Sequence, residues 1–289
     1  CMKYVRQKEW LLLLCDKKYH LYRMKELLDA FGVSESVQEE FMRDKKILLN
    51  RRVVNKDTLM KEGDTIQIKA FEPQEIDFIA EKGDLEVVYE DDLLLVVNKP
   101  RGIMVHPDSK EKGGTLANLV ANYYQEKGIM TSVRPIHRLD TDTTGLVIFS
   151  KCSFFQPLLD KMLKEKKIKR HYYAFVEGVV EQDGKIEAPI GRDRHDAKKF
   201  RVSKTGKYAL THYKVVRNQK KFTLLECVLD TGRTHQIRVH LAHIGHPIVA
   251  DVLYGEDYDH LDMGLQAYKV VFDHPLTNER VQVAIPCAF

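Results

Sequence analysis

The chain has 289 residues, of which 44% are hydrophobic and 30% are charged, and it carries a formal net charge of +4 at pH 7. These proportions are ordinary for a globular protein with a buried core and exclude a low-complexity chain. The mildly basic balance permits a polyanionic partner without demanding one, because localised basic patches matter more than the total charge.

The cysteines and the apolar runs indicate the compartment. Five cysteines are scattered without paired spacing, which predicts free thiols in a reducing compartment and no disulfide framework. The N-terminal apolar run from Trp10 to Cys15 is too short for a membrane span or a secretory signal. The sequence therefore predicts a cytoplasmic protein without a membrane partner, and a monomer is the default expectation.

Residues 1–71 are predicted to form a small α/β module. A strand is expected at residues 9–15, helices at 21–31 and from a cap at Ser34, and a hairpin at residues 50–68. This order of elements resembles that of the S-four-type RNA-binding domain, and the matching sequence segments are 48-LLNRRVVN-55 and 62-EGDTIQI-68. The second helix carries several glutamates beside its basic residues, so a module used only for packing stays open as an alternative.

Residues 72–84 are acidic, contain Pro73 and Gly83, and are predicted to be a linker. The second domain is expected over residues 85–289. Strands are expected near residues 87–89, 93–97, 146–150, 172–180, 208–216, 222–229, 268–272 and 281–285, and helices at 115–125, after Ser153 and after Thr234. Mostly hairpin-connected strands with few helices predict an α+β domain around a mixed, largely antiparallel sheet. Residues 191–207 are predicted to be a strongly basic loop.

The polar stretch 137-HRLDTDTTGLVIF-149 precedes a buried strand and contains two carboxylates, Asp140 and Asp142. Arg238 is expected in the first turn of its helix, where a cation is unfavourable by up to about 1 kcal/mol unless a carboxylate pairs with it. Either aspartate is a candidate partner, and pairing would keep it ionised. An ionised, desolvated aspartate is a nucleophile of the kind used on glycosidic carbons. An ordinary structural salt bridge is the alternative.

Other chemistries find less support in the sequence. No glycine-rich loop joins a strand to a helix, and no serine or cysteine lies in a nucleophile elbow. The histidines after residue 234 lack a carboxylate or cysteine that would complete a metal site. We therefore expect neither a metal nor a cofactor.

Four sequence segments, in the same order along the chain, resemble the signature segments of the RluA-type RNA pseudouridine synthases. They are 89-YEDDLLLVVNKPRGIMVHP-107, 137-HRLDTDTTGL-146, 172-YYAFVEG-178 and 231-TGRTHQIRVHLAHIGHPI-248. The resemblance extends from about residue 85 to the C-terminus and includes 274-HPLT-277. It implies an enzyme that isomerises uridine in RNA by breaking the N1–C1′ bond, turning the uracil and joining C5 to C1′. Large-subunit ribosomal RNA is the expected substrate. A transfer RNA, or an RNA-binding ribosome-assembly factor whose catalysis is dispensable, are the alternatives.

The resemblance also implies roles for individual residues. Asp140 is the catalytic aspartate, which either attacks the sugar C1′ or assists departure of the base. Tyr172 packs on the flipped uracil and helps to remove the C5 proton, and Arg238 pairs with the aspartate. Strand alternation allows only one of Tyr172 and Tyr173 to face the pocket. The expected RNA-binding set is His137, Arg138, Lys167, Lys169, Arg192, Arg194, Lys199, Arg201, Arg233 and His235.

Two departures from the family pattern are visible. Thr144 replaces a serine, and Ala250-Asp251-Val252 stands where Gly-Asp-Pro is common. We expect neither to touch the chemistry. Asp142 lies outside the acid position of the motif and is expected to be a surface or structural residue. A glycosidase that uses Asp140 and Asp142 as its carboxylate pair does not fit, because the loop lacks the aromatic residues of a sugar platform.

Overall fold

The N-terminal sheet is built from alternating apolar residues. The computed structural model describes residues 2–107, 109, 112–258 and 260–289, and its first sheet has the strand order β1-β2-β5-β3-β4. The elements are β1 (Tyr4–Gln7), β2 (Trp10–Leu14), η1 (Lys17–Tyr19), α1 (Met24–Ala30), α2 (Glu35–Arg43), β3 (Ile47–Leu49), β4 (Arg52–Val53) and β5 (Thr65–Ile68). Leu11 and Leu13 of β2 and Ile66 and Ile68 of β5 are fully buried on one face.

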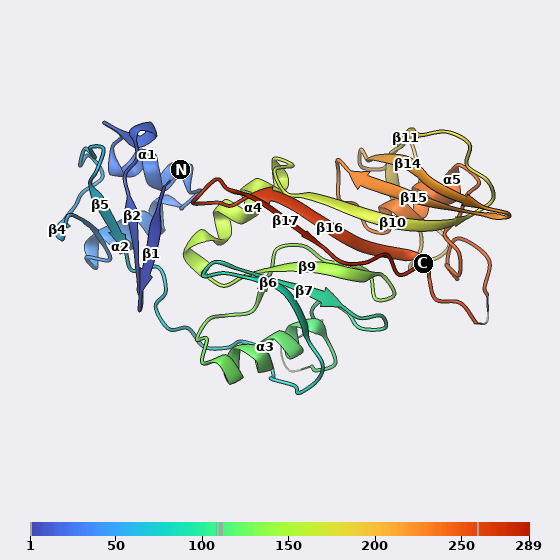
Figure 1. Ribbon diagram of the computed structural model, residues 1–289, viewed down its shortest axis with the longest axis horizontal. Coiled ribbons are helices and arrows are strands. Elements are labelled where there is room, and N and C mark those ends of the chain that lie inside the picture. Colours follow the sequence, from blue (N-terminus) through green and yellow to red (C-terminus); the bar gives the residue numbers. More distant parts are fainter. Residues whose placement is uncertain (1, 108, 110–111, 259) are drawn as a thin grey trace.

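A second sheet, of ten strands, forms the centre of the remaining chain (Figure 1). Its strands are β6 (Glu86–Glu90), β7 (Leu94–Lys99), β8 (Arg134–Pro135), β9 (Thr144–Ser150), β10 (Lys169–Glu177), β11 (Gly184–Glu187), β14 (Leu210–Gln219), β15 (Phe222–Leu229), β16 (Leu265–Asp273) and β17 (Arg280–Ala284). The order is β11-β14-β15-β10-β16-β9-β7-β6, with β17 paired to β16 and β8 to β9. The β9–β16 pair is parallel and the other named pairs are antiparallel, which confirms the predicted mixed α+β class.

The parallel pair places the motif loop at the middle of this sheet. Gly145 at the start of β9 has φ +113°, and a side chain there would run into the backbone of Ala267 in β16. Only glycine permits this close approach. As a result, residues 137–143, which lead into β9, lie close to β10, the strand on the other side of β16.

Three helices and a small hairpin accompany the sheet: α3 (Leu116–Lys127), α4 (Gln156–Lys164), α5 (Gln236–His243), and the pair β12 (Ile190–Arg192) and β13 (Phe200–Val202). The basic segment 191–207 is therefore partly a hairpin and not wholly a loop. The predicted caps at Ser153 and Thr234 are wrong. A 3-10 turn, η2 (Ser153–Phe155), precedes α4, whose N-cap is Phe155, and α5 begins after His235, which has φ +55°.

The two sheets meet through aromatic contacts. Phe31 stacks edge-on against Phe155 with ring centroids 5.3 Å apart, Phe41 lies 4.9 Å from Phe154, and Tyr4 stacks on His274. The expected linker runs extended along the second sheet's helices, where the amide of Glu81 donates to the carbonyl of Asn118 in α3. The N-terminal sheet is thus packed against its neighbour and is not joined by a free tether.

Four of the five cysteines, Cys15, Cys152, Cys227 and Cys287, are free thiols, and Cys1 lies outside the described residues. Among the helices that the structure describes, none has the length and hydropathy needed to cross a membrane.

Candidate active site

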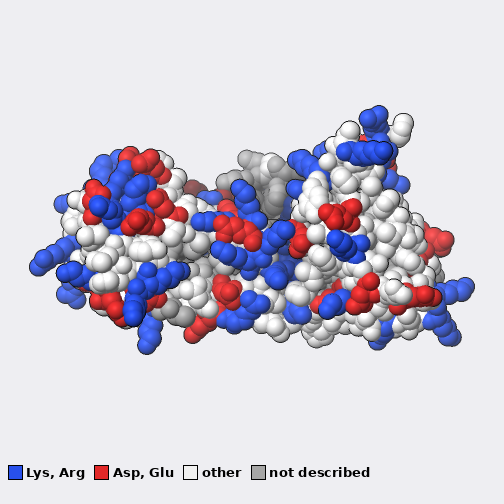
Figure 2. All heavy atoms as spheres, turned by 90° about the horizontal axis from the view of Figure 1, so that it is seen from above, with Lys and Arg blue, Asp and Glu red and all other residues white. Residues whose placement is uncertain are grey.

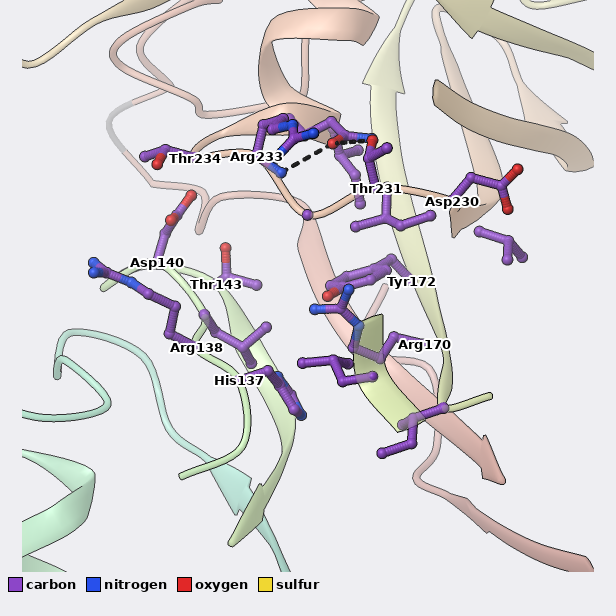
Figure 3. Close-up of a pocket in the computed structure, with 18 of the residues that line it drawn as sticks. His137, Arg138, Asp140, Thr143, Arg170, Tyr172, Asp230, Thr231, Arg233 and Thr234 are labelled. Atoms are coloured by element: carbon purple, nitrogen blue, oxygen red, sulfur yellow. Dashed lines mark hydrogen bonds between the residues drawn. The ribbon is translucent and has the colours of Figure 1, made fainter. Parts of the chain in front are cut away.

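Three segments that are distant in the sequence line a cavity of about 770 Å³. Figure 3 shows Arg138 and Asp140 on the loop before β9, Arg170 and Tyr172 on β10, and Arg233 on the loop before α5. The turn between α4 and β10 closes one end with Lys164, Lys166 and Lys169. A concave site with a few convergent polar groups is the usual form of a binding pocket.

The structure selects between the two candidate carboxylates. Oδ2 of Asp140 lies 3.2 Å from Nη1 of Arg238, although the two residues are 98 positions apart. Asp140 is partly buried and lines the cavity, whereas Asp142 is exposed and is not among the residues around it. The acid–arginine pair inferred from sequence is therefore formed by Asp140.

Asp251 is a site residue that sequence reasoning missed. Its carboxylate is fully buried and accepts two hydrogen bonds from Arg238, from Nε at 2.7 Å and from Nη2 at 2.8 Å. Burial alone would lower the pKa of Arg238, but the hydrogen bonds and charge of Asp251 outweigh burial and raise it. Asp251 is the residue that this stretch shares with Gly-Asp-Pro, so the departures at Ala250 and Val252 leave in place the carboxylate that holds the guanidinium beside Asp140. A buried arginine needs a counter-charge, and that need was the available signal.

Tyr172 and Tyr173 lie on opposite faces of β10, as the alternation predicts. The side chain of Tyr172 is buried and lines the cavity, whereas Tyr173 stacks on Tyr268 with ring centroids 3.7 Å apart. Burial raises the pKa of Tyr172, while the nearby charge of Arg170 opposes that rise. The phenol is therefore protonated at neutral pH, and its ring forms a wall of the cavity across from Asp140 (Figure 3).

Gln236 shapes the loop that carries Arg233 and His235. Its buried Oε1 accepts from the Thr231 hydroxyl at 2.7 Å and from the Arg233 amide at 3.0 Å, as the dashed lines of Figure 3 show. Its Nε2 donates to the carbonyl of Leu210. With both ends satisfied, this amide holds the loop over the cavity.

Lys99 is a second residue that the sequence did not indicate. Its fully buried ammonium donates to the carbonyls of Pro100, Ile103 and Thr141 at 2.8–2.9 Å. Burial lowers the pKa of Lys99 to about 8, against the opposing charges of Asp142 and Asp140. Three carbonyl acceptors match the three protons of an ammonium, so we regard Lys99 as charged at neutral pH. It ties the residue after Asp140 to the end of β7.

His137 does not fit the RNA-binding role expected of it. The side chain is only 8% exposed, and Nε2 accepts the amide hydrogen of Ile148. Burial, helped by the charge of Arg170, lowers the pKa of His137 to about 3. The imidazole is therefore neutral and cannot act as a cation for a phosphate; it lies behind the cavity wall.

The other expected RNA-binding residues fall into two groups. Arg138, Lys169, Arg233 and His235 line the cavity. Lys167 is exposed and paired with Glu165 at 2.7 Å, and the remaining four, Arg192, Arg194, Lys199 and Arg201, lie on or between β12 and β13, away from the cavity lining. Figure 2 shows Lys and Arg side chains gathered near the middle of one face of the molecule. The cavity thus has cations of its own, and the hairpin carries a separate set.

His240 in α5 and His246 just after it are held by structural hydrogen bonds. His240 is fully buried between the hydroxyl of Thr211 and the carbonyl of Ala188, and His246 contacts the carbonyl of Glu177. Within the described ranges, no three His, Cys, Asp or Glu side chains are grouped to hold a metal ion.

Comparison with known proteins gives consistent results. The family described as RNA pseudouridylate synthase matches residues 93–243. The chain is 39% identical to the uncharacterized RNA pseudouridine synthase YhcT of Bacillus subtilis, over 95% of this chain and 92% of that protein. It is 34% identical to ribosomal large subunit pseudouridine synthase D of Vibrio cholerae, over 88% of this chain and 83% of that protein. The solved human RNA pseudouridylate synthase domain containing 1 superposes with a TM-score of 0.60 at 25% identity, covering 71% of this chain and 86% of that one.

Proposed function

Because this chain belongs to the RNA pseudouridylate synthase family and is an RNA pseudouridine synthase, we propose that it isomerises uridines of large-subunit ribosomal RNA with Asp140 as the nucleophile. The proposed substrate rests on relatives named as large-subunit synthases, including the Vibrio cholerae protein. The observation that carries the proposed nucleophile is the Asp140–Arg238 ion pair in the cavity wall, at 3.2 Å.

The proposed reaction is balanced without any other reactant. A carboxylate oxygen of Asp140 attacks C1′ of the ribose, and the N1–C1′ bond breaks so that the uracil leaves as an anion. The uracil turns, its C5 attacks C1′, and the bond from C1′ to Asp140 breaks, which regenerates the carboxylate. The C5 proton is then lost and N1 gains a proton, so that the product is an isomer of the substrate. Splitting one displacement into two is the usual benefit of a covalent intermediate.

Arg238 and Tyr172 serve this sequence in different ways. Arg238 keeps Asp140 charged and oriented, and Asp251 in turn holds the guanidinium in place. The ring of Tyr172 packs against the uracil while it turns, and its oxygen accepts the C5 proton as the phenol passes its own proton to solvent. A fixed charge pair in a partly dry site needs little reorganisation as the reaction proceeds.

The uridine reaches Asp140 only after it leaves the RNA stack, which costs a few kcal/mol. Cations around the cavity offset that cost by holding the phosphates of the flanking nucleotides; they are Arg138, Lys164, Lys166, Lys169, Arg170 and Arg233. We assign Arg138, which is exposed at the mouth, to the space that the flipped nucleotide vacates. Residues 1–71 are proposed as an S-four-like RNA-binding module, residues 72–84 as the linker, and residues 85–289 as the catalytic domain.

The test is a map of pseudouridine in total RNA from a strain that lacks the gene. Purified protein is added, and carbodiimide-dependent reverse-transcription stops mark each pseudouridine. We expect new stops in large-subunit ribosomal RNA with wild type and none with Asp140→Asn. Stops confined to transfer RNA would replace the proposed substrate, and full activity of Asp140→Asn would remove the nucleophile assignment. Restored ribosome assembly by Asp140→Asn in cells would favour the assembly-factor alternative.

A further inference from the structure

His235 lies at the end of a chain of hydrogen bonds that determines where its ring proton is. The backbone amide of Phe200 donates to the hydroxyl oxygen of Tyr254 at 2.9 Å. The hydroxyl of Tyr254 lies 2.8 Å from Nδ1 of His235. The oxygen accepts from Phe200, and when its own hydrogen is donated to Nδ1 the hydroxyl uses both its acceptor and its donor; Nδ1 is then the unprotonated nitrogen of the ring.

In this arrangement the proton of a neutral His235 is on Nε2, the nitrogen that lies nearer the catalytic loop. Nε2 lies 3.8 Å from Oδ2 of Asp140, the same oxygen that Arg238 contacts at 3.2 Å. The imidazole is confined edge-on by the rings of Phe200 and Tyr254, with centroids 5.5 Å and 5.7 Å away. Its N–H is thus aimed at Asp140 by a fixed environment.

We propose that His235 is a positioning residue for Asp140: its Nε2–H and the Arg238 guanidinium together engage Oδ2, and Oδ1 is the oxygen that attacks C1′. The inference rests on the proposed role of Asp140 as nucleophile. The gap of 3.8 Å is longer than a hydrogen bond, so the proposal requires the two atoms to approach one another in the RNA complex.

The charges around His235 agree with a neutral donor. Burial lowers the pKa of His235, and the charge of Asp140 opposes that effect. The other charged groups that face the ring are Arg238, Asp251 and Arg138, of which the two arginines act with burial. A neutral ring with a fixed tautomer delivers a hydrogen bond to Oδ2 without neutralising the nucleophile.

The relay also ties the active site to the basic hairpin. Phe200, whose amide starts the chain, is the first residue of β13, and the guanidinium of Arg192 in β12 lies over its ring at 5.7 Å.

The test combines three substitutions with two measurements. Ring ¹⁵N shifts of labelled histidine report the tautomer, and single-turnover conversion of a ribosomal RNA fragment is followed against pH. In the wild-type protein we expect Nε2 of His235 to be protonated and Nδ1 to be unprotonated at neutral pH. Tyr254→Phe should lose that tautomer and slow the turnover by about tenfold, the effect of one hydrogen bond. Its rate should recover toward acid pH, where the imidazolium again presents an Nε2–H.

Two histidine variants separate positioning from packing. The amide nitrogen of His235→Gln reaches the place of Nε2, so this variant should retain most of the rate, whereas the shorter side chain of His235→Asn should not. RNA affinity should be the same in both. Equal rates for Gln and Asn at every pH, or a wild-type ring protonated on Nδ1, would overturn the inference. A wild type that converts no uridine but shows the Nε2–H tautomer would instead refute the proposed function.

Discussion

Replacement of Asp251 by asparagine tests whether the buried pair behind the active site holds Arg238. The substitution keeps the shape of the side chain and removes one charge. The side chains of Asp251 and Arg238 are 0% and 6% exposed, so the guanidinium would lose its main counter-charge in a dry environment. Breaking such a pair costs about 3–5 kcal/mol, and we expect the lower end, about 3 kcal/mol, because Asp140 remains a partial partner.

Activity should fall for a separate reason. Arg238 would no longer be aimed by two hydrogen bonds, and a shift of about 1 Å in a catalytic group can cost about 100-fold in rate. We therefore expect a single-turnover rate about 100-fold below wild type, with RNA affinity nearly unchanged because Asp251 is fully buried behind the cavity wall.

The assays are urea unfolding and single-turnover conversion of the mapped RNA. Asp142→Asn is the matched control, since it removes the same charge from an exposed position close to Asp140. The double variant Asp251→Leu with Arg238→Met replaces the buried pair by apolar groups and should regain stability without activity. If Asp251→Asn unfolds at the wild-type urea concentration and reacts at the wild-type rate, the reasoning about the buried pair is refuted.

Four further outcomes are expected. Lys99→Met leaves three carbonyls without their donor, so it should reduce the free energy of unfolding in urea by about 1–3 kcal/mol and also lower the turnover rate. An unchanged rate would contradict the role of Lys99 in holding the loop after Asp140. Tyr172→Phe should slow single turnover by about 100-fold, while its control Tyr173→Phe should match wild type. Similar rates for the two variants would contradict the role of the Tyr172 hydroxyl in proton removal. In the folded protein the pKa of His137 is about 3, so the unfolded chain binds more protons once the pH falls below about 6.5. By pH 5 the free energy of unfolding should therefore fall by about 2 kcal/mol, and His137→Gln should lack this contribution to the acid destabilisation. Lys199→Ala on the hairpin should reduce the salt dependence of RNA binding by about one unit of slope in a filter-binding series, and an unchanged slope would place the RNA elsewhere.

Local patterns in the sequence determined the elements and much of the site. The alternation in β10 placed Tyr172 and Tyr173 on opposite faces, and the structure confirms this arrangement. The apolar strands predicted around the motif are present, and their hairpin connections indicated the mixed sheet. These features depend on residues that are neighbours in the chain, so their periodicity is legible without the fold.

Helix boundaries were less readable, because they depend on contacts from other segments. Thr234 has the composition of a cap, yet the buried amide of Gln236 accepts the amide hydrogen of Arg233 and moves the start of α5 past His235. The hydrogen bond from Gln236 to the carbonyl of Leu210, which holds this amide in place, spans 26 positions. No window of nearby residues contains that information.

The electrostatics of the site were decided only by the tertiary structure. The loop composition left Asp140 and Asp142 equal and the family resemblance favoured Asp140, but only the fold shows Arg238 brought to Asp140 across 98 positions. Asp251, Lys99 and the neutral state of His137 are likewise consequences of burial. The sequence shows which charged residues a chain contains, whereas their pairing and desolvation depend on which of them the fold buries close to one another.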